Sequence, residues 1–188
     1  MSSTTRKRAS QGLDYYRTPS WCVEAIAPHL PHVPALDPCC GDGSILDALQ
    51  EFGWPVDLLD GTEVDCERAH IASEKGYGVT LGDALGARWC SYGLVVMNPP
   101  FSKAEAFVRK ALAEAAPVRG TVAALLRLAF LEGQARAEFH REHPSDVFVL
   151  SKRPSFTGGK TDSCAYAWLI WAPGRGGRWS ILEAPNGR

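Results

Sequence analysis

Short apolar segments alternate with segments whose apolar residues recur at helical spacing over most of the chain. The first kind predicts strands at 35–39, 56–59, 79–81, 94–97, 121–126, 147–150 and 165–171. The second kind predicts helices at 19–30, 44–52, 66–75, 103–116 and 132–141. Strands that are apolar throughout are typical of a parallel sheet that is covered on both faces. The alternation therefore predicts an α/β fold with a doubly wound, mostly parallel sheet.

Unusual segments follow the first four predicted strands. Gly41-Asp42-Gly43 follows the first strand, Gly61-Thr62-Glu63 the second, Asp83 the third and Asn98-Pro99-Pro100 the fourth. In doubly wound sheets, ligands bind outside the carboxyl ends of the strands. We therefore expect these four segments to line one ligand site.

The segment Asp37-Pro38-Cys39-Cys40-Gly41-Asp42-Gly43 indicates a turn that lies against a ligand. Its glycines permit a tight turn and a close approach just before a helix N-terminus. Glu63 lies 22 residues after Gly41, where a carboxylate can accept both hydroxyls of a ribose. Asp83, after the third strand, can meet an adenine amine, which completes a pocket for an adenosine-containing cofactor. A structural turn explains the two glycines alone about as well, because Leu46 replaces the third glycine of the dinucleotide fingerprint.

Asn98-Pro99-Pro100-Phe101 predicts a site for a conjugated amine. Two prolines after an apolar strand leave backbone carbonyls without a ladder partner. The Asn98 side-chain oxygen and the Pro99 carbonyl can then converge on one amine. Because two acceptors on its N–H bonds free the lone pair, the amine becomes a better nucleophile. Phe101 offers a ring on which a flat substrate group can stack. The alternative is a proline-rich turn in which Asn98 caps a helix.

The order of these segments resembles that of the class I S-adenosylmethionine-dependent methyltransferases. The order is Tyr16-x-Thr18-Pro19, the segment 37–43, Glu63, Asp83 and Asn98-Pro99-Pro100-Phe101. More narrowly, the chain is similar to amino-group methyltransferases and, within them, to small phage-type DNA adenine-N6 methyltransferases. The similarity extends from Tyr15 to Trp171. The tetrapeptide is less specific for the substrate, because ribosomal RNA, tRNA and glutamine methyltransferases also carry it.

The resemblance implies a Rossmann-like class I methyltransferase fold with a C-terminal antiparallel hairpin, and S-adenosylmethionine as cofactor. It implies that Tyr16, Thr18 and Pro19 close over the methionine end of the cofactor. The remaining implied cofactor-binding residues are Asp37, Cys39, Gly41, Gly43, Glu63 and Asp83. The catalytic residues would be Asn98, Pro99, Pro100 and Phe101, which would hold the target amine.

The loop 153–163 joins the last two predicted strands, beside the expected substrate cleft. In the related enzymes an aromatic residue here stacks on the flipped base, and Phe156 fits that role. Lys160 follows two glycines and can approach a phosphate. Arg153 and Arg127 are further candidates for substrate binding. An ordinary hairpin loop with a packed phenylalanine is an equally good interpretation.

Thr18 and Pro19 also predict a helix start, with Thr18 as the N-cap and Pro19 at the first helical position. The polar residues 1–12 predict a flexible basic arm. The length of 188 residues fits one domain, so we expect residues 13–188 to form a single methyltransferase domain without a separate target-recognition domain. Site choice would then depend on loops, be relaxed, or be supplied by a partner.

Charge is unevenly distributed, although the net charge is only −1. Residues 1–20 contain four basic and one acidic residue, and residues 151–188 contain six basic and two acidic ones. Basic surface at both ends is suited to phosphate contacts, but solubilising tails would have the same composition. No segment has the length and apolar character of a membrane span.

The six cysteines lack Cys-x-x-Cys spacing, and the start of the chain has no apolar core of a signal peptide. We therefore expect reduced thiols, no metal site, and a cytoplasmic protein of a prokaryotic or phage-infected cell. The sequence favours methyl transfer from S-adenosylmethionine to an exocyclic amine, and the resemblance favours adenine N6 in DNA. RNA or a protein glutamine as substrate, or a cofactor-binding module without catalysis, are the alternatives.

Overall fold

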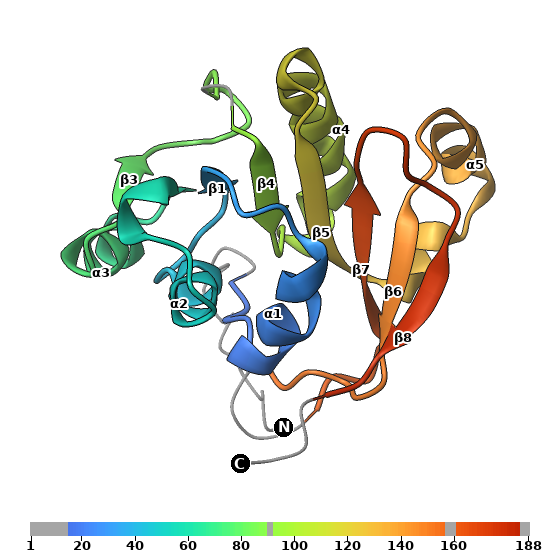
Figure 1. Ribbon diagram of the computed structural model, residues 1–188, viewed down its shortest axis with the longest axis horizontal. Coiled ribbons are helices and arrows are strands. Elements are labelled where there is room, and N and C mark those ends of the chain that lie inside the picture. The colour runs from blue at the N-terminus through green and yellow to red at the C-terminus, as the bar shows by residue number, and fades with distance from the viewer. Residues whose placement is uncertain (1–14, 90–91, 157–160, 185–188) are drawn as a thin grey trace, which may run out of the picture.

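The structure is a computed structural model that describes residues 15–89, 92–156 and 161–184 (Figure 1). The α-helices are α1 (Ser20–Ile26), α2 (Ser44–Glu51), α3 (Cys66–Glu74), α4 (Ala104–Ala115) and α5 (Gln134–Glu142). The strands are β1 (Ala35–Asp37), β2 (Leu59–Glu63), β3 (Gly78–Leu81), β4 (Leu94–Met97), β5 (Thr121–Arg127), β6 (Asp146–Leu150), β7 (Tyr166–Trp171) and β8 (Trp179–Leu182). Short 3-10 turns lie at Ala27–His29, Val56–Leu58, Phe101–Lys103, Ala116–Val118 and Leu128–Leu131.

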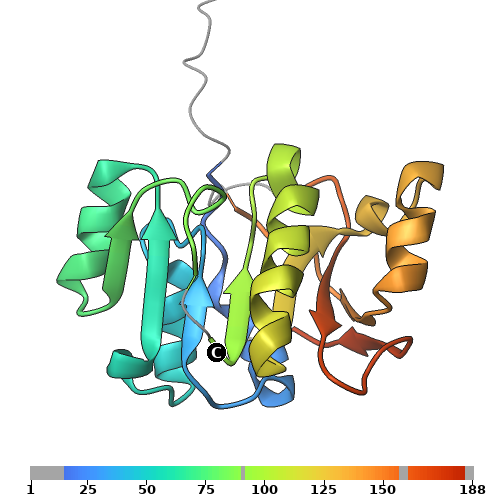
Figure 2. The same ribbon diagram turned by 90° about the horizontal axis from the view of Figure 1, so that it is seen from above.

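The strands form one sheet in the order β3-β2-β1-β4-β5-β7-β6-β8. The five strands from β3 to β5 are parallel to one another. β7 is antiparallel to both β5 and β6, so the sheet ends in the expected C-terminal hairpin. From β1 the chain continues to β2 and β3 on one side and then crosses to β4 on the other side, so the carboxyl end of β1 lies at the topological switch point. Figure 2 shows the arrows of β1 to β4 pointing to this edge.

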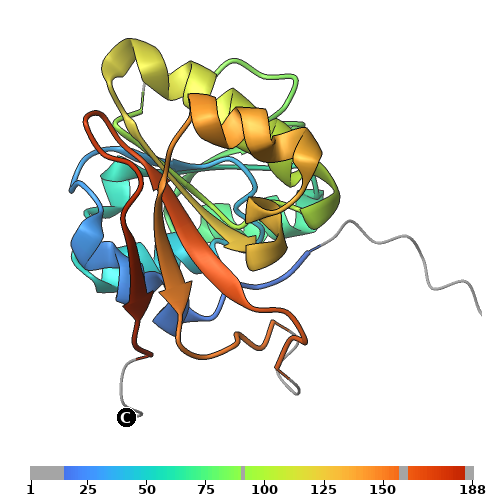
Figure 3. The same ribbon diagram turned by 90° about the vertical axis from the view of Figure 1, so that its right-hand side faces the viewer.

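Two apolar clusters fill the space between the sheet and its helices. One cluster packs α1 and α2 against one face through Ile26, Leu46 and Trp168. The other packs α4 and α5 against the opposite face through Val108, Phe139 and other residues (Figure 3). The central strand β4 is buried on both faces, which explains why it is apolar at every position, whereas β3 and the edge strand β8 are largely exposed. The predicted fold class, with helices on both faces of a mostly parallel sheet, is confirmed.

The predicted strand at 56–59 is wrong in its position. Val56–Leu58 forms a 3-10 turn, and β2 begins at Leu59 and includes Gly61. A Cβ at position 61 would come within 2.5 Å of the Cys40 Sγ, so the close packing of β2 against the turn after β1 requires a glycine inside the strand. Because glycine is read as a turn signal, the local pattern ended the predicted strand too early.

The predicted start of the first helix is also wrong. Pro19 occupies the N-cap position with extended backbone angles, and α1 begins at Ser20. The Thr18 side chain makes no cap hydrogen bond, because its hydroxyl oxygen is a partner of Asn98 instead. The sequence analysis also missed β8, a short strand that pairs in parallel with β6 at the edge of the sheet.

The expected basic arm at 1–12 lies outside the described residues. Within the described part of the chain, no helix has both the length and the apolar character to cross a membrane. The same residues contain no group of three or more His, Cys, Asp or Glu side chains placed as metal ligands.

Candidate functional site

A cavity of about 480 Å³ lies at the carboxyl edge of the sheet. This volume falls in the range of about 300–1,000 Å³ that is typical of small-molecule sites. The cavity brings together eight of the predicted residues, which come from five separate segments of the chain. They are Tyr16, Thr18, Asp37, Cys39, Glu63, Asp83, Asn98 and Pro100. The fold thus brings these segments together at one edge of the sheet, as the sequence pattern predicts.

The turn after β1 is built on two glycines with left-handed backbone angles. Gly41 has a φ of 56° and Gly43 a φ of 86°, and Gly43 is the N-cap of α2. These values disfavour any residue with a Cβ. A Cβ at Gly41 would also overlap the Tyr15 ring. The turn therefore packs closely against the Tyr15 and Tyr77 rings just before a helix N-terminus, and neither glycine lines the cavity itself.

Glu63 is fixed at the end of β2 by three donors. One carboxylate oxygen accepts from the Gly41 backbone N–H at 2.9 Å. The other accepts from the Asp65 N–H at 2.8 Å and from Arg68 at 3.3 Å. The residue is 6% exposed, yet it lines the cavity. Because each carboxylate oxygen has about two acceptor positions, Oε2 retains capacity for a ligand hydroxyl.

Asp37 is a buried carboxyl group at the end of β1, with 1% of its surface exposed. Burial raises the pKa of Asp37 to about 7, although the N–H and S–H groups of Cys39 partly oppose this rise. The Cys39 N–H donates to Asp37 at 3.0 Å. A cationic ligand in the cavity would favour the charged form of this group.

The sequence analysis missed several residues that line the same cavity. Val64 is 51% exposed directly after Glu63, and an apolar side chain at such a strand end is a signal that the sequence contained. Arg68, on α3, lies under the Tyr15 ring, with its guanidinium carbon 4.6 Å from the ring centroid. Nothing in the local sequence pattern indicated this contact. The other missed residues are Pro38, Cys40, Ser44, Ile45, Thr62, Gly82, Ala84, Ser102, Lys103 and Phe107.

Asn98 follows β4 at the boundary between the cavity and an aromatic cluster. Its side-chain nitrogen donates to the Tyr16 main-chain carbonyl at 3.2 Å and to the Thr18 hydroxyl oxygen at 3.0 Å. Its main-chain carbonyl lies 3.6 Å from the Cys39 sulfur. The neighbouring Pro99 is buried, and Pro100 lines the cavity.

Four aromatic rings gather beside Asn98. The Phe101 centroid is 4.8 Å from that of Tyr16 and 6.0 Å from that of Tyr166. Phe156 joins the cluster, 5.8 Å from Tyr16 and 5.1 Å from Tyr166. The predicted partners Phe101 and Phe156 therefore lie in one cluster, which also contains Tyr16 and Tyr166.

Arg127 lies over the Phe101 ring, with its guanidinium carbon 3.7 Å from the ring centroid. The guanidinium also donates to the Tyr166 hydroxyl at 3.1 Å and lies 3.8 Å from Asp162. A flat substrate group that stacks on this face of Phe101 must displace the guanidinium. Arg153 is exposed, and Lys160 lies outside the described residues.

Comparison of the sequence with protein-family models and with curated proteins gave no match. Comparison of the structure with solved structures gave many. A putative class I S-adenosylmethionine-dependent methyltransferase from Listeria monocytogenes matches with a TM-score of 0.70 at 15% identity, over 91% of this chain and 67% of that one. A putative RNA methyltransferase from Pyrococcus horikoshii matches with a TM-score of 0.63 at 20% identity, over 88% of this chain and 90% of that one.

A type I restriction-modification methyltransferase subunit from Streptococcus thermophilus matches with a TM-score of 0.71 at 16% identity. The match covers 92% of this chain, which spans only 49% of that subunit. At these identities the likeness concerns the fold. The chain has the Rossmann-like fold of the class I methyltransferases.

Proposed function

We propose that the protein transfers a methyl group from S-adenosylmethionine to an exocyclic amine, and that the amine is N6 of adenine in DNA. The observation that carries the proposal is the position of Asn98. This residue lies at the rim of the cavity, between the turn that follows β1 and the aromatic cluster around Phe101. A cofactor in the cavity and a base beside Phe101 would therefore meet at Asn98.

The groups that line the cavity match the chemical groups of the proposed cofactor. Glu63 is held in place with an acceptor position free for a ribose hydroxyl, and the glycine turn fixes the Gly41 N–H that holds it. Val64 offers an apolar surface for the adenine ring, and Asp83 lies beside it as an acceptor for the adenine amine. Asp37 is the buried carboxyl group that would complement a cationic ligand.

The cofactor supplies an electrophilic methyl group on a sulfonium. The residues of this chain supply alignment. The Asn98 oxygen and the Pro99 carbonyl would accept from the amine, so that its lone pair is directed at the methyl group and the developing positive charge is stabilised. The new N–C bond forms as the S–C bond breaks, and the surplus amine proton leaves to water.

Adenine in DNA is proposed as the substrate because the chain offers rings and cations around Asn98. Phe101 and Phe156 can enclose a flat base that has been flipped from the duplex, at a cost of a few kcal/mol. The exposed cations Lys103, Lys152 and Arg153 lie in segments that begin at the carboxyl ends of β4 and β6. A glutamine side chain would need neither set of groups.

The proposal is tested with isotope-labelled S-adenosylmethionine and a panel of duplex DNA, structured RNA and a glutamine-containing peptide. We expect label in duplex DNA, and N6-methyladenine after digestion to nucleosides. The Asn98→Ala variant is the matched control, and it should transfer label at least about a hundredfold more slowly. Label on RNA or glutamine but not on DNA would overturn the substrate, and the absence of label on every amine would overturn the activity itself.

A further inference from the structure

The side-chain amide of Asn98 is fully engaged on its nitrogen side. The nitrogen carries two N–H groups. One group has the Tyr16 carbonyl as partner at 3.2 Å, and the other has the Thr18 hydroxyl oxygen at 3.0 Å. The oxygen of the same amide accepts no hydrogen bond from any residue that the structure describes, while Asn98 itself lines the cavity. The amide is therefore asymmetric, with the nitrogen bound to protein and the oxygen left for a ligand.

This orientation follows from the chemistry of the partners. A carboxamide has nearly the same shape when its oxygen and nitrogen are exchanged, so partners decide which atom lies where. The Tyr16 partner is a main-chain carbonyl, which can only accept. A flipped amide would set two carbonyl oxygens against each other and would turn two N–H groups toward the cavity. Those groups would repel the N–H bonds of a target amine.

We propose that Thr18 is a positioning residue which, with the Tyr16 carbonyl, holds the Asn98 amide so that its oxygen and not its nitrogen faces the target amine. The inference rests on the proposed function of Asn98 and goes beyond it. It assigns to Thr18 a role toward the amine, in place of the N-cap role and beyond the cofactor contact that the sequence suggested.

The anchoring of Thr18 supports this role. Thr18 is 3% exposed, so water does not compete for its hydroxyl. Its backbone N–H donates to the Ser44 hydroxyl at 3.3 Å, on the first residue of α2. The preceding Arg17 forms an ion pair with Asp42 at 2.8 Å. Thr18 is thus tied to the glycine turn on one side and to Asn98 on the other.

The segment 15–18 consequently links the two halves of the site. Tyr15 lies against Gly41 and Arg68 in the cofactor half, and the Tyr16 ring packs against Phe101 in the substrate half. The same arrangement disfavours an aspartate at position 98. A second carboxylate oxygen would face the Tyr16 carbonyl, which has no proton to donate.

The first experiment compares Thr18→Val, which keeps the shape and removes the acceptor, with Thr18→Ser, which keeps the hydroxyl. We expect Thr18→Val to lower kcat for methyl transfer by about three- to tenfold, the equivalent of one hydrogen bond, and to change KM for DNA and affinity for S-adenosylmethionine less than it changes kcat. Thr18→Ser should restore most of kcat. The buried Thr121→Val, at the far end of β5, is the matched control and should leave kcat unchanged.

The second experiment observes the Asn98 side-chain amide by ¹⁵N NMR, with its signals assigned by their loss in Asn98→Asp. In the unaltered chain the two protons should exchange slowly with water, and Thr18→Val should shift one of them and speed its exchange. Unchanged Asn98 signals in Thr18→Val, or equal kcat in Thr18→Val and Thr18→Ser, would overturn the proposal. If Thr18→Val does not fold, fast exchange of both protons in the unaltered chain overturns it. A chain that methylates no amine refutes the proposed function, whereas the NMR result still decides the role of Thr18.

Discussion

The two halves of the site are built by different means. In the cofactor half, formed by β1 to β3, the groups are fixed by backbone: Glu63 accepts from two main-chain N–H groups, and glycine angles shape the turn at 41–43. In the substrate half, beside β4 to β7, the groups are side-chain rings and a guanidinium over Phe101. Rigid backbone suits a ligand that is always the same. A surface of rings and long cations can rearrange, which suits a substrate that must enter and leave.

The difference predicts that damage to each half will have a different kinetic signature. Loss of a group in the cofactor half should weaken binding of a small molecule. Loss of a group in the substrate half should lower the rate of methyl transfer or weaken binding of nucleic acid. The following expectations test this division, in order of decreasing effect.

Asn98→Ala should abolish most methyl transfer and leave the cofactor bound. Alanine removes the acceptor for the amine, but it leaves the turn at 41–43 and Glu63 intact. The loss of a positioned acceptor costs about 3–4 kcal/mol, a rate loss of a hundred- to a thousandfold. Single-turnover methylation of an adenine-containing duplex measures it, with cofactor affinity determined in parallel.

Asn98→Asp should keep only part of the activity, because the carboxylate still accepts from the amine but its second oxygen faces the Tyr16 carbonyl. Phe101→Ala should lose less than Asn98→Ala because Phe101 only stacks. A near-normal single-turnover rate in Asn98→Ala would remove the residue from the chemistry, and most of the proposed function with it.

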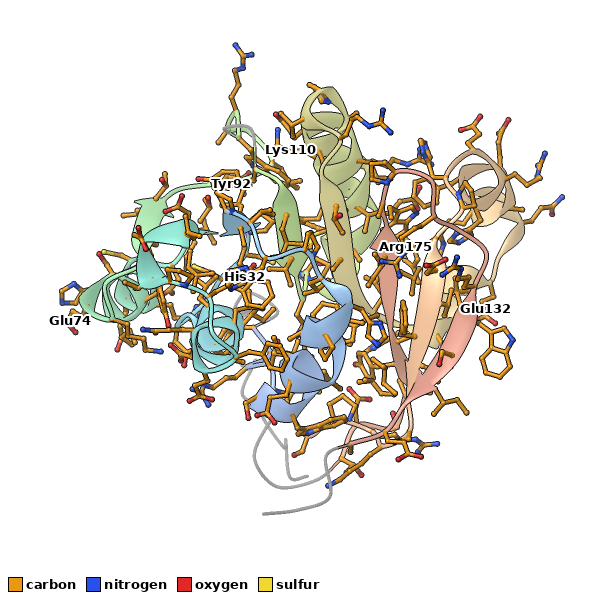
Figure 4. The ribbon with its side chains drawn as sticks, in the orientation of Figure 1. His32, Glu74, Tyr92, Lys110, Glu132 and Arg175 are labelled. Carbon is orange, nitrogen blue, oxygen red and sulfur yellow. The ribbon has the colours of Figure 1, made fainter. Side chains whose placement is uncertain are left out.

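Glu63→Ala should weaken the binding of S-adenosylmethionine. A charge-assisted hydrogen bond to a ribose hydroxyl is worth about 1.5–3 kcal/mol, so the dissociation constant should rise by about ten- to 150-fold. Glu74→Ala is the control, because Glu74 is a glutamate at the end of the following helix, α3, where its side chain is 67% exposed and points away from the cavity (Figure 4). Calorimetry that gives equal affinity for a folded Glu63→Ala and for Glu74→Ala would exclude Glu63 from the site.

Neutralising Lys152 and Arg153 should weaken DNA binding by about tenfold at moderate salt and flatten its salt dependence, since each phosphate contact adds about 0.9 to the slope. The matched control is the pair Arg119→Gln and Arg141→Gln, which are exposed cations near the opposite edge of the sheet. Neutralising Arg6, Lys7, Arg8 and Lys160, which lie outside the described residues, should also weaken DNA binding and flatten its salt dependence. If the binding constant depends on salt concentration equally in the Lys152/Arg153 variant and in the control variant, these cations only make the protein more soluble.

Cofactor affinity should rise with pH between about 6 and 8, by at most tenfold per unit. Burial raises the pKa of Asp37 to about 7 in the folded chain, and a cationic ligand binds better once this group has lost its proton. The same shift makes the folded state bind the proton more tightly than the unfolded state. Its contribution to stability is therefore present at low pH and is lost as the pH rises through 7.

Calorimetry in two buffers of different ionisation enthalpy measures the proton released on binding. Asp37→Asn should abolish both the pH dependence and the proton release. Affinity that is independent of pH in the unaltered chain would show that Asp37 does not sense the charge of the ligand.

The cofactor half was largely predictable because its signals are local. Glycine at 41 and 43, and carboxylates at the ends of strands, report backbone angles and edge positions that the sequence pattern reveals directly. Val64 carried a similar local signal, because it is an apolar residue directly after a strand end. Arg68 and Tyr15 carried none, since their contact joins segments far apart in the chain.

The substrate half was predictable in its residue types but not in its contacts. The rings of Phe101 and Phe156 could be assigned to one region, yet nothing in the sequence placed Arg127 over Phe101 or Tyr166 beside both. Such contacts depend on β5 and β7 being neighbours in the sheet, and strand pairing between distant segments has no local sequence signature.

Alternation of apolar and helical segments, by itself, determined a doubly wound sheet and the edge at which its site lies, because both follow from periodicity and from the direction of parallel strands. At Thr18 the local pattern gave the wrong role. Its local signal was that of a helix cap, yet the Asn98 amide at 3.0 Å became its partner, and Pro19 took the cap position. Only the tertiary structure decided this, because a buried hydroxyl binds the strongest donor that packing brings within reach, and that donor lies 80 residues away along the chain.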